Sequence, residues 1–179
     1  LCTLCTPVAA PSCCLFFHSR LTSELYTRSL VARFICVEDT VALQQAHRPY
    51  YDKFVAAVSG SELEPQTLTE IFADITQHSP AVRNNGGGYY NHILYWNCMS
   101  QDGGGEQLAD WLGDKSTFGD FAALQDQFAQ AAINTFGSGF AWLVVEEGQL
   151  KIISTSNQDN PWIDTVASNG EPILALDVW

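Results

Sequence analysis

The fold is decided by residues 139–154, which read GFAWLVVEEGQLKIIS. Two apolar runs of strand length, residues 140–145 and 150–154, flank the turn-forming segment EEGQ, and this is the pattern of a β-hairpin. After a polar loop, residues 172–179 read PILALDVW and form another short apolar run. This part of the chain therefore predicts three short strands in an antiparallel meander.

Upstream of the strands, apolar side chains recur at the spacing of helices. Residues 46–59, 67–75 and 121–131 each carry apolar residues three and four positions apart. Thr67 and Glu70 form a capping box at the start of the second run, which marks a helix N-terminus. Three helices are expected from these runs.

A further helix is expected at residues 89–98, where Tyr89, His92 and Trp96 share one face. We interpret the asparagine and glycine residues at 84–88 as a loop before it. The three glycines at 103–105 are a candidate boundary between subdomains, and a short helix is expected at 108–112. Helices followed by helices and a small sheet place the chain in the α+β class.

Composition and charge exclude two classes of function. The chain has 179 residues, is 46% hydrophobic and carries a formal net charge of -12. Residues 38–179 hold five basic against nineteen acidic residues, a balance that repels phosphate backbones, so no nucleic-acid partner is expected. No apolar run reaches the roughly 18 residues that cross a bilayer, so no membrane association is expected either.

Residues 1–39 differ from the rest of the chain and are not expected to belong to the fold. They contain three arginines, few acids, many Ser and Thr, and five of the six cysteines. This composition is typical of a mitochondrial or plastid transit segment, and a mis-called upstream segment is the alternative, with a cytoplasmic protein as its consequence. The remaining Cys98 is expected to be a buried, unreactive thiol.

His92 and Asp177 are the residues whose surroundings raise a chemical question. Asp177 is the one polar residue in its apolar strand, so it needs a cation or several donors unless it reaches solvent at the strand end. His92 shares a helix face with aromatic residues and is either a hydrogen-bonded core residue or a ligand. Together they are a nitrogen and oxygen pair suited to iron or manganese.

Five motifs, in order and spacing, resemble the iron/manganese superoxide dismutase family. They read NHILYWNC at 91–98, GGGE at 103–106, FGSGFAWLV at 136–144, STSNQD at 154–159 and LDVW at 176–179. The resemblance covers about residues 50–179. It implies an N-terminal antiparallel helical hairpin, residues 40–102, followed by a helical and three-stranded antiparallel sheet subdomain, residues 103–179.

The resemblance also implies a mononuclear metal centre with three His and one Asp as ligands. The residues that match the family's site are His92 and Asp177 as metal ligands, Tyr50 and Gln158 as catalytic residues, and His47, Trp96 and Trp179 around them. Glycine at position 88 with glutamine at 158 is the manganese-type arrangement, and iron is the alternative metal. Phe140 stands where the family usually has a tryptophan.

Two departures from the family pattern qualify the expected activity. The family spacing places the first ligand histidine at Ala42, and the fourth ligand would follow directly after Trp179, where the sequence ends. We therefore expect a superoxide dismutase fragment that is inactive by itself. The alternative is a metal-free, superoxide-dismutase-like structural subunit of a larger assembly. The resemblance implies superoxide as substrate and a homodimer or tetramer for the complete protein.

Overall fold

The structure is a computed structural model that describes residues 37–98 and 118–179, with side chains from residue 47 onward. Residues 1–36 of the expected leader, the glycine boundary at 103–105 and the helix expected at 108–112 lie outside these residues, whereas residues 37–39 of that leader belong to a helix. Two long helices, α2 (Val37–Val58) and α4 (Pro80–Asn97), run antiparallel beside one another, and the short helix α3 (Leu68–Ala73) and the 3-10 helix η2 (Ile75–Gln77) connect them.

The capping box is confirmed at the start of α3. The Thr67 side chain accepts a hydrogen bond from the Glu70 backbone N–H, and the Glu70 carboxylate accepts one from the Thr67 backbone N–H. Helix α2 begins at Val37, earlier than the expected residue 46, and continues through Pro49. Among the helices that the structure describes, none has the length and apolar character that crossing a bilayer requires.

The loop expected at residues 84–88 is wrong, because these residues lie inside α4. Ser79 caps the helix at Val82, and Pro80 occupies its first turn. Glycine inside a helix costs up to about 1 kcal/mol relative to alanine. Gly86, Gly87 and Gly88 are nevertheless buried, and neighbouring atoms approach them where a side chain would otherwise stand. Close packing against these three residues therefore outweighs their weak helix propensity.

The second half of the described chain is a helix on a three-stranded antiparallel sheet. It consists of α6 (Phe121–Asn134), β1 (Gly139–Glu146), β2 (Gln149–Ser156) and β3 (Glu171–Asp177). The strand order is β2-β1-β3, so the expected sequential meander is wrong in its order. β1 occupies the centre because six of its residues in a row are buried, whereas β2 alternates between buried and exposed positions and suits an edge.

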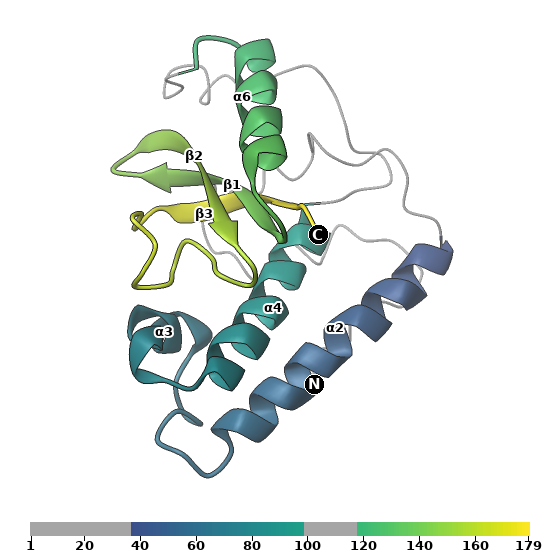
Figure 1. The fold of residues 1–179 in the computed structure, drawn as a ribbon, viewed down its shortest axis with the longest axis vertical. Coiled ribbons are helices and arrows are strands. Elements are labelled where there is room, and N and C mark those ends of the chain that lie inside the picture. Colours follow the sequence, from purple (N-terminus) through teal and green to yellow (C-terminus); the bar gives the residue numbers. More distant parts are fainter. Residues whose placement is uncertain (1–36, 99–117) are drawn as a thin grey trace.

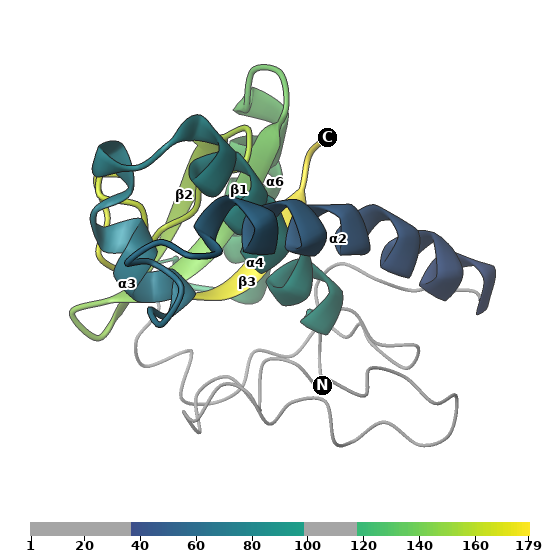
Figure 2. The same cartoon turned by 90° about the horizontal axis from the view of Figure 1, so that it is seen from below.

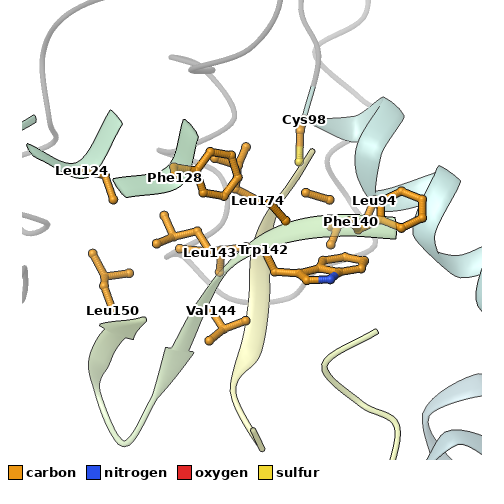
Figure 3. Close-up of a cluster of buried hydrophobic side chains, with 13 residues drawn as sticks. Leu94, Cys98, Leu124, Phe128, Phe140, Trp142, Leu143, Val144, Leu150 and Leu174 are labelled. Carbon is orange, nitrogen blue, oxygen red and sulfur yellow. The ribbon is translucent and has the colours of Figure 1, made fainter. Parts of the chain in front are cut away.

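Two hydrophobic clusters hold these elements, and α4 contributes to both. One lies between the sheet, α6 and the C-terminal end of α4, and contains Trp142, Leu124 and Leu94 (Figure 3). The other joins α2, α3 and the start of α4 to the loop after β2 through Phe72, Val82 and Ile163. Figure 1 shows α4 between α2 and the sheet, and α2 crosses α4 in the view from below (Figure 2), so residues on α4 reach both.

Cys98 lies in the first cluster and is buried there, as expected from the sequence. Its side chain is buried and forms no disulfide. Burial raises the pKa of the Cys98 thiol to about 12, so the reactive thiolate is absent at neutral pH.

Candidate metal centre

His92 and Asp177 come together where the end of β3 meets α4. His92 Nε2 lies 3.9 Å from Asp177 Oδ2, and both side chains are mostly buried. The Gly88 carbonyl lies 2.6 Å from His92 Nδ1, and because a carbonyl only accepts, Nδ1 carries the proton and Nε2 presents its lone pair to Asp177. The Trp179 backbone N–H donates to Asp177 Oδ1 and fixes the carboxylate. Each donor is thus oriented by a backbone group.

This pair fits a bridging cation better than a direct hydrogen bond. A separation of 3.9 Å is too long for a hydrogen bond between the two atoms. First-row metal ions bind imidazole nitrogen and carboxylate oxygen at roughly 2.1 Å, so one ion can reach both atoms across at most about 4.2 Å. A ring nitrogen whose partner nitrogen donates to a backbone carbonyl is also the usual arrangement of a metal-binding histidine.

The donor set is nevertheless small. Within residues 47–98 and 118–179, whose side chains the structure describes, no group of three or more His, Cys, Asp or Glu is placed to hold one ion. Ala42 lies in α2, and the side chain of alanine has no atom that binds a metal. The described residues therefore supply two donors of the kind that iron and manganese prefer, and further donors have to come from outside them.

Aromatic rings surround His92 on several sides. Tyr50 stacks on its imidazole at 5.2 Å between ring centroids, Phe140 meets it edge-on at 6.1 Å, and Trp96 lies at 6.2 Å. Trp96 Nε1 is buried and has no hydrogen-bond partner within the described part of the chain. Trp179 is different, because 63% of it is exposed, so the described chain does not bring this residue into the aromatic group.

Gln158 and Tyr50, the two expected catalytic residues, are joined directly. Gln158 Nε2 donates to the Tyr50 hydroxyl at 3.2 Å, although the residues belong to a loop after β2 and to α2. Gln158 is buried, and its Oε1 has no hydrogen-bond partner among the residues described. Since Tyr50 also stacks on His92, the amide, the phenol and the imidazole form one continuous group beside Asp177.

Gly88 is required for this arrangement. A Cβ atom at position 88 would lie 2.5 Å from Cδ1 of Tyr50 and 2.6 Å from its Cε1. These separations are far inside van der Waals contact, so no side chain fits while the Tyr50 ring stays in place. The glycine that suggests a manganese-type site is thus also the residue on which Tyr50 rests.

The Gly88→Ala variant is expected to displace the Tyr50 ring and break its hydrogen bond to Gln158. We expect the affinity of the candidate centre for a metal ion to fall by about tenfold, the lower end of the effect of disturbing groups that support a metal centre. Metal binding should be measured by titration beside a crystal structure of the variant. An unmoved Tyr50 ring, or unchanged metal affinity with a displaced ring, contradicts this prediction.

His47 lies next to this group and stacks on Tyr89 at 4.8 Å between ring centroids. Its Nδ1 is buried without a hydrogen-bond partner in the described part of the chain. Desolvation lowers the pKa of His47 from its ordinary value of 6.5, and the neighbouring His92 lowers it further. His47 is therefore neutral at pH 7.

This lowered pKa predicts a loss of stability on acidification. Well above pH 6.5, His47 is neutral in both the folded and the unfolded state, so its protonation does not reduce the free energy of unfolding there. As the pH falls below 6.5, the unfolded chain takes up the proton first, and stability is lost until the lowered folded pKa is passed. Denaturant unfolding at about pH 7.5 and about pH 5 should show a smaller loss for His47→Gln than for the unaltered protein. Equal losses in both proteins would mean that other groups carry the acid sensitivity.

The residues that hold Gln158 in place were not predicted from the sequence. Asn91 Nδ2 donates to the backbone carbonyls of Gln158 and Asp159, and Arg83 forms an ion pair with Asp159. The signal for Asn91 was its position beside His92 on a helix with apolar faces, where a fully buried amide needs partners. No sequence pattern pairs Arg83 with a residue so distant along the chain.

Two models of protein domains match most of this chain. The alpha-hairpin domain of iron/manganese superoxide dismutases matches residues 38–100, and the C-terminal domain of the same enzymes matches residues 106–179. Proteins named superoxide dismutase [Mn/Fe] 2 from Staphylococcus aureus strains Mu50 and N315 are each 40% identical over 138 residues. The match covers 74% of this chain and 66% of each relative, so the chain spans slightly less than two thirds of their length.

Proposed function

The chain belongs to the iron/manganese superoxide dismutase family, and from this premise we propose that its protein disproportionates superoxide to dioxygen and hydrogen peroxide at a mononuclear metal centre. The observation that carries the proposal is the convergence of His92 Nε2 and Asp177 Oδ2 at 3.9 Å, beside the Gln158–Tyr50 hydrogen bond. Because the chain spans only part of its relatives, the activity is proposed for the protein that supplies all the ligands.

The chemistry that a bound manganese or iron ion supplies is electron exchange, with one superoxide oxidised to dioxygen and a second reduced to hydrogen peroxide with two protons. His92 Nε2 and Asp177 Oδ2 would hold the ion. The Gly88 carbonyl accepts the hydrogen bond of Nδ1 and so selects the tautomer of the neutral ring that has its lone pair on Nε2. The Trp179 backbone N–H prevents the carboxylate of Asp177 from turning away.

Tyr50 and Gln158 would manage the protons of the reaction. The Tyr50 hydroxyl accepts a hydrogen bond from Gln158 Nε2, so its own O–H is directed elsewhere and is available to a small anion. Gln158 Oε1 is buried and unpartnered within the described residues, so it can accept a hydrogen bond from a donor that enters the site. The aromatic rings of Tyr50, Trp96 and Phe140 limit the water around His92.

Manganese is the metal that we propose first, with iron as the alternative. The support is the pairing of Gly88 with Gln158, because an amide donor beside solvent on a bound ion would change the proton affinity of that solvent and hence the redox potential of the ion. A glutamine side chain at position 88 would collide with Tyr50 in the present arrangement. The amide can therefore reach the site from the loop and not from α4.

The test is activity per bound metal. The protein that supplies all the ligands should be loaded with manganese and with iron in separate preparations, dialysed, analysed for metal and assayed for superoxide consumption. We expect turnover in proportion to bound manganese and less turnover per bound iron. Bound metal without turnover in either preparation would overturn the proposed reaction.

Ala42 supports one competing function. Because alanine at this position cannot bind a metal, a metal-free structural subunit of the same fold remains the second candidate. The loading experiment separates the two, since a structural subunit stays folded and metal-free after exposure to both ions. A folded protein that takes up neither manganese nor iron would favour this second function.

A further inference from the structure

We propose that Arg83 is a positioning residue that sets the Gln158 amide against Tyr50 by holding Asp159, the residue that follows Gln158. This inference rests on the proposed function, because it assigns Arg83 a part in the same reaction. Arg83 itself lies away from the reacting atoms. Its effect on the site passes through the loop backbone.

The buried Gln158 side chain has few hydrogen bonds that could fix its orientation. Its Nε2 donates one hydrogen bond to the Tyr50 hydroxyl, and its Oε1 has no partner in the described part of the chain. The Tyr50 bond is 3.2 Å long, at the upper end of the usual range. The position of the amide is therefore determined mainly by where the loop backbone places its Cα atom.

That backbone rests on one face of α4. A Cβ atom at Gly87 would lie 2.1 Å from the Gln158 carbonyl oxygen, so the loop lies directly against the helix at this residue. One turn later, Asn91 Nδ2 donates to the same carbonyl at 3.0 Å. Arg83, Gly87 and Asn91 are each four residues apart and thus lie on one stripe of α4.

Arg83 holds the far side of the loop from the same stripe. Its Nε donates to Asp159 Oδ1 at 2.8 Å and its Nη2 to Asp159 Oδ2 at 2.7 Å, a two-pronged contact between partly buried side chains. Nη2 also donates to the Thr165 hydroxyl at 3.2 Å. Paired, charge-assisted hydrogen bonds of this geometry fix orientation as well as distance.

The sheet holds the same loop from the opposite direction. The Thr155 hydroxyl donates to the Asp159 carbonyl at 2.7 Å, and Trp142 Nε1 in turn donates to the Thr155 hydroxyl at 2.8 Å. Since α4 also carries His92, Arg83 ties the helix that presents a metal donor to the loop that presents Gln158. Loss of the Arg83 contact should leave the loop attached to the sheet but shifted relative to His92.

The experiment is a double-mutant cycle between Arg83→Met and Gln158→Ala, with kcat measured at saturating superoxide. In the otherwise unaltered protein, Arg83→Met is expected to lower kcat by about tenfold, as loss of an outer support of a metal site does. In the Gln158→Ala background the same change should have little further effect on kcat, because the amide that Arg83 positions is already absent. Arg83→Lys should restore part of the loss, since lysine keeps the charge but cannot make both hydrogen bonds.

Lys151→Met is the matched control, because it removes another long cation from an ion pair, with Glu146 on the β1–β2 hairpin, and should leave kcat unchanged. Asp159→Asn replaces Arg83→Met if that variant fails to fold, and it should give the same pattern. A crystal structure of the variant supplies a second measurement, in which Gln158 Nε2 and Tyr50 Oη should separate beyond hydrogen-bond distance.

Equal losses from Arg83→Met in both backgrounds, or an unchanged distance between Gln158 and Tyr50, would overturn the positioning role and leave the proposed function standing. An unaltered protein that binds metal but consumes no superoxide would overturn the proposed function. In that case the Gln158–Tyr50 distance in the variant still decides whether Arg83 positions the amide.

Discussion

The Asp177→Ala variant is expected to lose superoxide consumption. Its content of manganese or iron after dialysis should be lower than that of the unaltered protein by about tenfold or more. Asp177 Oδ2 is one of the two donors that the described residues bring together at this centre, and changes to groups that merely support a metal ligand already cost about 10–100-fold. Removing the carboxylate also leaves His92 Nε2 without the oxygen that faces it. Metal analysis after dialysis and a superoxide assay measure both effects.

The control for this change is Asp164→Ala. Asp164 is also an aspartate that uses its carboxylate, accepting a hydrogen bond from the Thr76 hydroxyl at 2.6 Å, but it does not face His92. Its replacement should leave the metal content unchanged. Should Asp177→Ala bind as much metal as Asp164→Ala, the assignment of the centre to His92 and Asp177 is wrong.

Metal removal gives an independent measure of the same centre. Because an ion that binds only the folded state stabilises it, a chelator should lower the melting temperature of the unaltered protein. The Asp177→Ala variant has little metal to lose, so its melting temperature should barely respond. A chelator shift of the same size in both proteins would place the ion elsewhere.

The second large effect is expected for Gly87→Ala, which should lower the free energy of unfolding by about 1–3 kcal/mol. The added methyl group would lie 2.1 Å from the Gln158 carbonyl oxygen and 3.1 Å from its carbonyl carbon. Both are backbone atoms held by Asn91, so relief requires the loop to move away from α4. Gln158 would move with it, and turnover should fall together with stability.

Gly86→Ala is the control in the same helix. Its methyl group would meet two ring carbons of Phe54 at 3.1 Å, and a side-chain ring can tilt where a backbone carbonyl cannot. Alanine also gains up to about 1 kcal/mol of helix propensity over glycine, which offsets that contact. Denaturant unfolding of the two variants should therefore differ clearly, and equal free energies would contradict a rigid contact at Gly87.

Much of the candidate site was predictable residue by residue, but its geometry was not. His92 and Asp177 stood out because a polar residue among apolar neighbours needs a compensating partner. Their separation of 3.9 Å depends on the end of β3 packing against α4. No local sequence pattern predicts this packing. The contact of Arg83 with Asp159 has the same origin, because it joins residues from two elements that only the packed fold brings together.

The sequence by itself determined the features that depend on a few neighbouring residues. These include the capping box at Thr67 and Glu70, the hairpin across residues 146–149 and the α+β class. Each follows from local hydrogen bonds or from the period of apolar side chains. Such signals report which residues are buried, but not what covers them.

The tertiary structure alone decided the helical state of residues 84–88 and the central place of β1. By propensity, the glycines favour a loop, but α4 keeps them helical because Tyr50, Phe54 and the Gln158 backbone fill the space that their missing side chains leave. β1 lies between β2 and β3 because its side chains are buried on both faces. In each case the deciding energy comes from contacts between distant segments, which exist only after the chain has folded.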